Sequence, residues 1–289
     1  MKKTFLFWLI AVVITVTGAY YQRVTGPTYP FSGNVSINNK KIFYKLERSH
    51  SSSEDYVIKL KTNHTDVKGF LMWRRYKSKD DWSIFPMAYF ADTLTAMLPK
   101  QPPAGKIQYQ VILRNQNQVV AIPEKEPLVI RFKGDVPLYI LIPHVLAMFF
   151  AMLLSTRTGL EFFNKEPNFK KHTFWTLGVL FIGGLILGPL VQLYAFGALW
   201  TGVPFGFDLT DNKTLIAFLG WIIAAVAIHK SKRPKVWVLG AAILLLFIYL
   251  IPHSVLGSEL DYNKIDKQKN QNETLTTFDY QQTSSGKNL

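Results

Sequence analysis

Two histidines stand in nearly the same apolar surroundings, and their chemistry is the most distinctive in the chain. His144 ends the run YILIPH, and His253 ends the run IYLIPH. Neutral imidazoles from two facing helices are the usual way to hold a b-type haem, or to form part of a copper or zinc site. Asp208 and Asp211, in a loop between two later apolar runs, would add carboxylates to such a metal site.

A plainer interpretation of the same residues stays open. Each proline ends or kinks a helix, and the histidine after it bonds a carbonyl that the proline has freed. Likewise, Asp211 or Asn212 would cap the N-terminus of the following helix. The cofactor is therefore unknown, with haem b or a metal ion as the alternative to none.

A second candidate site is the segment Trp73-Arg74-Arg75-Tyr76-Lys77. Flat aromatic rings mixed with guanidinium groups are enriched in the parts of protein interfaces that contribute most to affinity. The segment therefore predicts a partner-binding surface, and the alternative is an ordinary strand with one basic face.

Several classes of chemistry are excluded by what is missing from the sequence. The chain has no cysteine, so disulfides, thiolate nucleophiles, iron–sulfur clusters and cysteine-ligated zinc are ruled out. It also contains no Walker loop, dinucleotide fingerprint, Gly-x-Ser-x-Gly elbow or His-Glu-x-x-His zinc helix. We therefore favour a non-enzymatic role.

Five apolar runs are long enough to place these residues in a membrane, because a bilayer core of about 30 Å needs roughly 20 apolar residues in a helix. The shortest, Thr214–Ile228, is the weakest candidate. The runs are Phe5–Tyr21, Pro137–Ser155, Phe174–Phe196, Thr214–Ile228 and Val236–Ile251.

The charges of the short loops alternate along the chain. Basic residues precede the first run and follow the second and fourth, with the densest cluster at His229–Lys235. By the positive-inside rule, this predicts a multi-pass protein of the cytoplasmic (inner) membrane with its N-terminus inside and its C-terminus outside. The net charge of +14, from 33 basic and 19 acidic residues, is thus partly a topology signal, and we expect no nucleic-acid partner.

Small and polar residues in the third run predict helix packing. Gly184 and Gly188 lie one turn apart, which lets another helix approach closely, either within the bundle or in a second copy. Gln192, in the same run, needs a polar partner inside the hydrocarbon.

Residues 28–135 alternate between apolar and polar positions in short runs, as expected of an extracytoplasmic all-β domain. The expected strands are 30–37, 41–48, 56–62, 68–76, 84–90, 93–98, 106–114, 118–122 and 128–132. Within them, Pro103–Val111 resembles the E–F corner and F strand of immunoglobulin-like and fibronectin type III-like sandwiches, in which a tyrosine pins the corner. The resemblance implies a β-sandwich that binds proteins or acts as a spacer.

The sequence thus predicts four parts: an anchor or signal peptide at 1–22, the β-sandwich at 28–135, a four-helix membrane bundle at 136–254, and a disordered extracytoplasmic tail at 255–289. The lysine- and asparagine-rich usage is similar to that of multi-pass envelope proteins of Bacteroidetes-like bacteria. The expected function is that of an accessory or scaffold protein whose sandwich binds a partner of an envelope complex. The alternative is a redox or metal protein that uses the two histidines.

Overall fold

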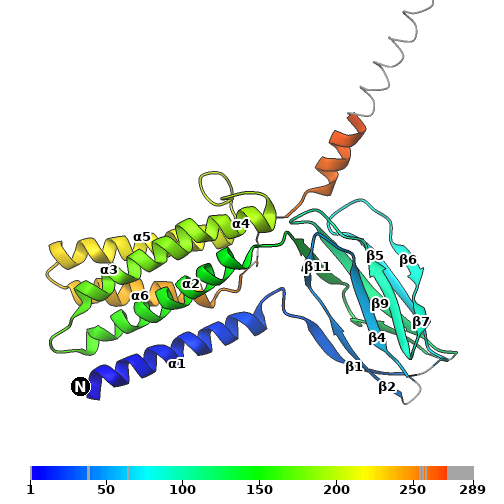
Figure 1. Cartoon of the computed structure of the whole chain (residues 1–289), viewed down its shortest axis with the longest axis horizontal. Helices are drawn as coiled ribbons and strands as arrows, with labels where there is room; N and C mark the ends of the chain where they lie inside the picture. The colour runs from blue at the N-terminus through cyan, green and yellow to red at the C-terminus, as the bar shows by residue number, and fades with distance from the viewer. Residues whose placement is uncertain are drawn as a thin grey trace, which may run out of the picture.

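A computed structural model describes residues 2–271, except 38, 39, 64, 117, 254, 256 and 258. Helices form one part of the molecule and strands the other, and the two parts lie end to end (Figure 1). The helices are α1 (Lys2–Thr25), α2 (Leu138–Gly159), η1 (Leu160–Phe163), α3 (Phe169–Leu180), η2 (Phe181–Leu187), α4 (Gly188–Phe196), α5 (Leu209–Lys230) and α6 (Pro234–Leu250).

Eleven strands make up the β-rich domain among the described residues. They are β1 (Phe31–Ile37), β2 (Lys40–Leu46), β3 (Ser49–Ser51), β4 (Tyr56–Lys61), β5 (Lys68–Arg75), β6 (Ser83–Pro86), β7 (Ala88–Phe90), β8 (Thr93–Leu98), β9 (Lys106–Arg114), β10 (Val119–Ile122) and β11 (Leu128–Lys133). The largest sheet runs β3-β11-β9-β5-β6, with β10 also paired to β9, and smaller sheets pair β1-β2 and β4-β8-β7.

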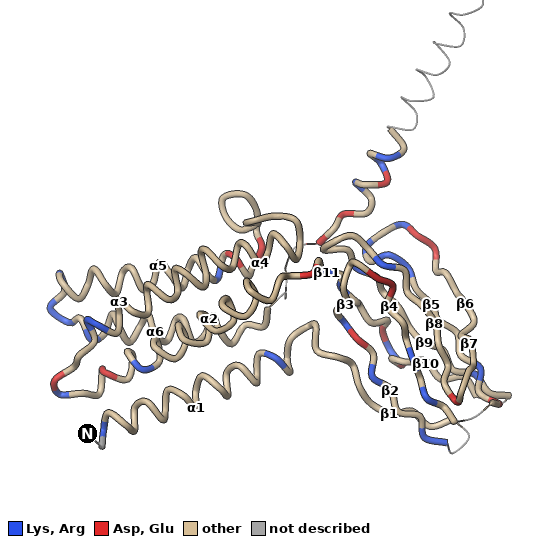
Figure 2. Tube along the Cα trace, viewed as in Figure 1, with Lys and Arg blue, Asp and Glu red and all other residues tan. Residues whose placement is uncertain are grey.

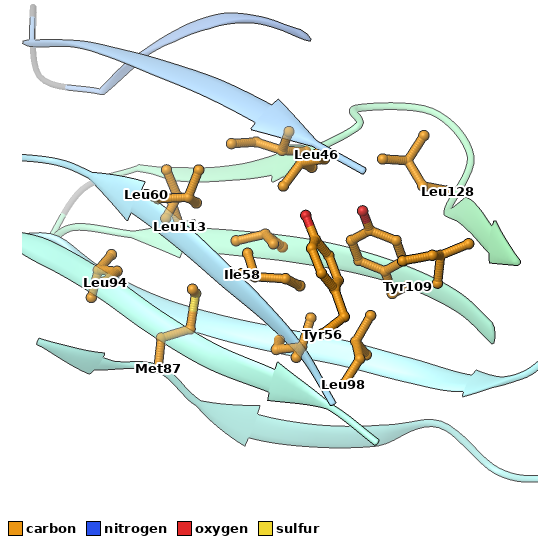
Figure 3. Packing of buried hydrophobic residues seen from close by; sticks show 14 of the residues in the cluster. Leu46, Tyr56, Ile58, Leu60, Met87, Leu94, Leu98, Tyr109, Leu113 and Leu128 are labelled. Atoms are coloured by element: carbon orange, nitrogen blue, oxygen red, sulfur yellow. The ribbon is translucent and has the colours of Figure 1, made fainter. Parts of the chain in front are cut away.

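One apolar core joins the three sheets, because inward-facing residues alternate with outward-facing ones along each strand. Tyr109 and Tyr56 lie in this core with both phenol oxygens turned the same way (Figure 3). The Tyr109 hydroxyl donates to the carbonyl of Glu47 at 2.7 Å, and the Tyr56 hydroxyl accepts from the Glu47 amide at 2.9 Å. Tyr109 therefore pins the end of β2, and not the neighbouring corner that the sandwich resemblance implies.

The sequence pattern located most strands but missed two details. The expected strand at 84–90 is interrupted at Met87, where the chain leaves the large sheet as β6 and joins the three-stranded sheet as β7. The short strand β3 was not expected, and it pairs in parallel with β11. The immunoglobulin-like assignment itself stays a prediction.

Four helical segments are long and apolar enough to cross a membrane, which is compatible with a membrane protein. They are Lys3–Thr25, Leu138–Phe163, Phe169–Phe196 and Leu209–Lys230. The run expected at Thr214–Ile228 is thus part of the longer helix α5, which begins with a polar turn at Leu209. The shorter helix is α6, whose 17 residues span about 25 Å at 1.5 Å per residue.

The first helix packs as a member of the bundle. Gly18 of α1 faces the side chains of Tyr249 and Leu250 in α6, and Gln22 donates to the carbonyl of Tyr249 at 2.7 Å. At its other end, the Trp8 ring lies edge-on to His172. These contacts place α1 against α6 and α3.

The two parts of the molecule meet at a tight junction. The amide of Gly134 donates to the carbonyl of Ala195 at 2.9 Å, and a Cβ at position 134 would collide with the carbonyl of Tyr194. Beside it, the buried guanidinium of Arg131 lies 3.9 Å from the centre of the Phe196 ring. Burial lowers the pKa of Arg131 to about 10, so the group stays protonated at neutral pH.

Candidate functional site

The predicted partner-binding segment lies at the end of β5 and in the turn that follows. Strand alternation puts Trp73 and Arg75 on one face and Arg74 on the other. Trp73 packs against the apolar core, while Arg74 lies 4.5 Å from the centre of the Trp82 ring. The Tyr76 ring lies between the ammonium groups of Lys77 and Lys106, so the five residues do not form one continuous surface.

Arg75 is held between two carboxylates. Its Nε and Nη2 donate to Asp80 at 2.6 and 2.7 Å, which fixes the guanidinium from the side of the turn. Its Nη1 and Nη2 donate to Asp266 at 3.0 and 2.7 Å. Paired bonds of this kind are among the strongest in proteins and fix the orientation of both groups. Asp266 therefore approaches an arginine that Asp80 has already oriented.

Two lysines clamp a second carboxylate from the same part of the chain. Lys77 lies 2.8 Å from one oxygen of Glu259, and Lys106 lies 2.5 Å from the other. The Asn263 amide adds a bond to the carbonyl of Lys77 at 2.9 Å. The basic end of the predicted segment thus contacts Glu259 and Asp266, and Asp266 lies 191 residues beyond Arg75 along the chain.

Tyr262 lies between the two carboxylates and is 4% exposed. The guanidinium of Arg75 is 4.9 Å from its ring centre, within cation–π range. Its hydroxyl accepts from the Lys106 amide at 3.0 Å and donates to Oε1 of Gln101 at 3.0 Å. A Cβ at Gly105 would lie 2.8 Å from this hydroxyl, so the glycine leaves the space that the phenol needs.

We call Arg75, Lys77, Gln101, Gly105 and Lys106 the tail-docking surface, and residues 259–271 the tail segment. Residues 262–271 of the tail segment are helical, and this helix starts near the junction of the two parts (orange in Figure 1). Acidic and basic residues are mixed along its trace (Figure 2).

The ion pairs at the tail-docking surface shift the pKa values of the paired groups in the direction that favours their charged forms. The bonds from Arg75 lower the pKa of Asp80 and of Asp266, and the two acids raise that of Arg75. Partial burial acts to raise the pKa of Glu259, but the bonds from Lys106 and Lys77 outweigh it and the net shift is downward. Burial raises the pKa of Tyr262 to about 12. All these groups therefore keep their usual charges at neutral pH.

The expectation of a disordered tail does not hold for residues 259–271. A composition poor in large aliphatic residues predicted it, but one tyrosine and two acids find a complementary surface far away in the sequence. Their spacing of three and four residues, from Glu259 to Tyr262 to Asp266, was the available signal, since it is typical of one helix face. Residues 272–289 lie outside the described part of the chain.

The two histidines of the predicted cofactor site lie in the half of the bundle nearest the β-rich domain. Nδ1 of His144 is 2.9 Å from the carbonyl oxygen of Gly183, which also accepts the amide of Gly188 in the π-helical segment η2. Its ring packs 3.7 Å from the position of a Cβ on Gly188. The histidine thus bonds a carbonyl of a neighbouring helix, and not one freed by Pro143 in its own helix, as the plainer interpretation expects.

His253 lines a cavity of about 30 Å³, together with Gln22, Lys213 and Tyr249. That volume is about the share of one water molecule in the liquid, whereas ligand pockets span roughly 300–1,000 Å³. This cavity beside His253 is too small for a haem. The bis-histidine site stays a prediction that this packing does not support.

The carboxylates of the predicted metal site bond backbone amides. Asp208 caps α5 by accepting from the Thr210 amide at 2.8 Å, which corrects the expected cap at Asp211 or Asn212. Asp211 instead accepts from the amides of Thr201 and Gly202 at 2.7 and 3.0 Å. Within the described ranges, no three His, Asp or Glu side chains come together in a way that could hold a metal ion.

The predicted packing residues contact several neighbours within the bundle. A Cβ at Gly184 would lie 2.7 Å from the methyl of Thr214 in α5, whereas Gly188 faces His144 in α2. The two glycines therefore face different helices, because η2 is π-helical and its wider turn changes their relative direction. The amide of Gln192 finds its polar partner in the Thr201 hydroxyl at 2.6 Å.

Sequence reasoning missed a buried ion pair at the far end of the bundle. Arg157 and Glu161 are 2.5 Å apart, and both side chains are almost fully buried. Glu161 also accepts from the Asn164 side chain and the Asn168 amide. Their spacing of four residues is visible in the sequence and is typical of an ion pair on one helix face. No protein-family model matches this chain, and no curated protein sequence matches it.

Proposed function

We propose that this chain is a non-enzymatic accessory or scaffold protein of a bacterial-type cytoplasmic membrane. Its β-rich domain, in an immunoglobulin-like sandwich, would bind a protein partner of an envelope complex while the helices anchor it. The observation that carries this proposal is the tail-docking surface. Its three cations bind carboxylates, and the space beside Gly105 accepts an aromatic ring. Oriented arginines of this kind are typical of protein-recognition sites.

The proposed topology has the N-terminus inside and the β-rich domain outside. Lysines and arginines gather at the end of the bundle away from the β-rich domain (Figure 2). This end holds the start of α1 and the ends of α2 and α5, where the positive-inside rule expects the cytoplasm. The contacts of α1 with α6 favour a retained anchor over a cleaved signal peptide.

The absence of cysteine makes the topology simple to test. Two exposed positions are suitable for single cysteines. Lys79 lies beside the tail-docking surface, and Lys232 lies in the loop between α5 and α6. A membrane-impermeant maleimide should label Lys79→Cys on cells with a permeabilised outer envelope, and Lys232→Cys only after lysis. Labelling in the opposite order would refute the topology.

Partner binding is tested by photo-crosslinking in cells from position 79, beside the tail-docking surface. A photoreactive amino acid at Lys79 should give a discrete crosslinked protein, which Arg75→Gln weakens by removing the oriented guanidinium. The same amino acid at Val119, exposed on β10, is the matched control and should not give that product. A lone monomer in mild detergent, without a crosslink that depends on Arg75, would refute the proposed function.

A further inference from the structure

The tail segment is bound in the manner of a peptide ligand. Three of its side chains enter separate sites on the β-rich domain: Glu259 between two lysines, Tyr262 against Gly105, and Asp266 on Arg75. The pattern is acidic-x-x-aromatic-x-x-x-acidic. A backbone bond from the Leu260 amide to the carbonyl of Ala104, at 3.2 Å, adds a contact that any sequence could make.

We propose that the tail-docking surface is a receptor for an acidic helical segment of a partner protein, and that the chain's own tail segment is a tethered competitor. The partner segment would carry two carboxylates around an aromatic residue at the spacing of Glu259, Tyr262 and Asp266. This inference rests on the proposed function, and it specifies the class of partner and the way its access is controlled.

Charge complementarity supports this class of partner. The three cations of the tail-docking surface, with Asp80 as the one acid bound to them, leave two positive charges, and the two tail carboxylates match them. Asp80 keeps Arg75 oriented whether or not the tail segment is present. A basic or neutral helix would leave these charges unpaired, so it is disfavoured.

The contacts of the tail segment are of a kind that can exchange. The side chains of Asp266 and Lys77 remain 44% and 64% exposed, so salt weakens their ion pairs. Tyr262 is the deeply buried anchor of the tail segment. The docked tail segment is therefore held by Tyr262 together with the ion pairs of Glu259 and Asp266, and by its short connection to the bundle.

That connection, residues 251–258, sets the strength of the competition. A short tether gives an effective concentration of about 1 mM. If the free segment has an intrinsic Kd of about 0.1 mM, the tail reduces the apparent affinity of an equal competitor roughly tenfold. A partner must therefore make further contacts, or be concentrated at the same membrane.

The experiment uses a fluorescent peptide with the sequence of residues 257–271 and the purified chain in nanodiscs. The peptide should bind a chain that ends at residue 256, and bind the full chain about tenfold more weakly. A full chain with Glu259→Gln and Asp266→Asn should bind the peptide almost as well as the truncated one, which shows the effect without a deletion. Asp261→Asn is the matched control: Asp261 bonds only the amide of Lys264 within the helix, so the peptide should bind as it does to the parent.

A second pair of variants checks that the peptide occupies the same surface. In the truncated chain, Arg75→Gln should abolish binding and Arg74→Gln should preserve it, because Arg74 stacks on Trp82. A peptide that binds no variant, or binds the full and truncated chains equally, overturns the inference. So does a dimer of the full chain that Glu259→Gln and Asp266→Asn dissociate, because the occupant would then be a second copy.

The two proposals fail in different ways. If the peptide does not bind but the crosslink from position 79 still depends on Arg75, the partner-binding function stands and the competing tail is wrong. If the peptide binds as expected but no crosslinked partner appears in cells, the competing tail stands and the partner-binding function is wrong.

Discussion

Tyr262→Phe is the most informative single change, because it removes one oxygen atom and keeps the ring. The hydroxyl makes two hydrogen bonds, one from the Lys106 amide and one to Gln101, each at 3.0 Å. A net contribution of roughly 0.5–1.5 kcal/mol for each gives a loss of about 2 kcal/mol. That is roughly a 30-fold shift of the tail segment toward the undocked state. Because burial raises the pKa of Tyr262 to about 12, the hydroxyl is neutral and the result should be the same from pH 6 to 9.

Amide hydrogen exchange measures this shift at two places. The amides of Lys106 and Leu260 both bond across the contact between the tail segment and its surface. With the tenfold preference for docking given above, a 30-fold shift raises the undocked fraction from about a tenth to about three quarters, so in Tyr262→Phe the Leu260 amide should exchange about eightfold faster. The Lys106 amide, which also loses its acceptor, should be accelerated by at least as much. The amide of Met72, inside the β5–β9 pairing, should keep its parent rate.

Two results would contradict a role of Tyr262 in holding the tail segment. Parent-like exchange at Lys106 and Leu260 would mean that Tyr262 does not hold the tail segment. Faster exchange throughout the β5–β9 sheet would mean that the tyrosine stabilises the whole domain, and the docking contact could not be treated separately. Tyr262→Ala should exceed the effect of phenylalanine, since it also removes the buried ring.

Four further predictions follow from the same structure. Docking lowers the pKa of Glu259 and of Asp266. The stability that these carboxylates give to docking is therefore present above their ordinary pKa values of about 4 and is lost as the pH falls through their lowered values. The anisotropy of a dye on Lys267→Cys should drop over that pH range. Glu161→Gln should lower the free energy of unfolding by about 3 kcal/mol in a denaturation assay, because the Arg157 charge stays buried without its counter-ion. Glu166 is exposed, so Glu166→Gln should change the same free energy by under about 0.5 kcal/mol. Arg131→Ala should make the junction between the two parts more sensitive to protease, through loss of about 1–2 kcal/mol of cation–π contact. Purified protein should show neither a Soret band nor stoichiometric metal, and a bis-histidine haem spectrum would revive the redox alternative.

The pattern of apolar residues was sufficient to locate the helices and most strands. Long apolar runs and strict alternation are local signals, and burial of those side chains dominates the energetics of each element. The errors fall where polar residues belong to an element. Thr210, Asp211 and Asn212 lower the hydropathy of the first turn of α5, so the sequence pattern predicts a loop there and does not predict Asp208 as the cap.

The candidate site was predictable only in part. The sequence predicts a partner-binding surface at Trp73–Lys77, which stays a prediction, but it does not predict that the neighbours of this segment come from the 99–106 turn and from the end of the chain. Contacts over more than 150 residues leave no periodic signal in one sequence, because they depend on how the β-rich domain is oriented on the bundle. For the same reason, the two histidines looked paired in sequence although each has a different neighbour in space.

The bond between Gly134 and Ala195 has a consequence for what the β-rich domain can reach. There is no space for a side chain at Gly134, and Arg131 packs on the ring of Phe196. These contacts restrict rotation of the β-rich domain relative to the helices at this junction. In the proposed topology, the distance of the domain from the lipid would therefore be fixed. The proposed partner would have to bring its binding segment to that distance from the bilayer, so the length of the partner, as much as its affinity, would decide whether it binds.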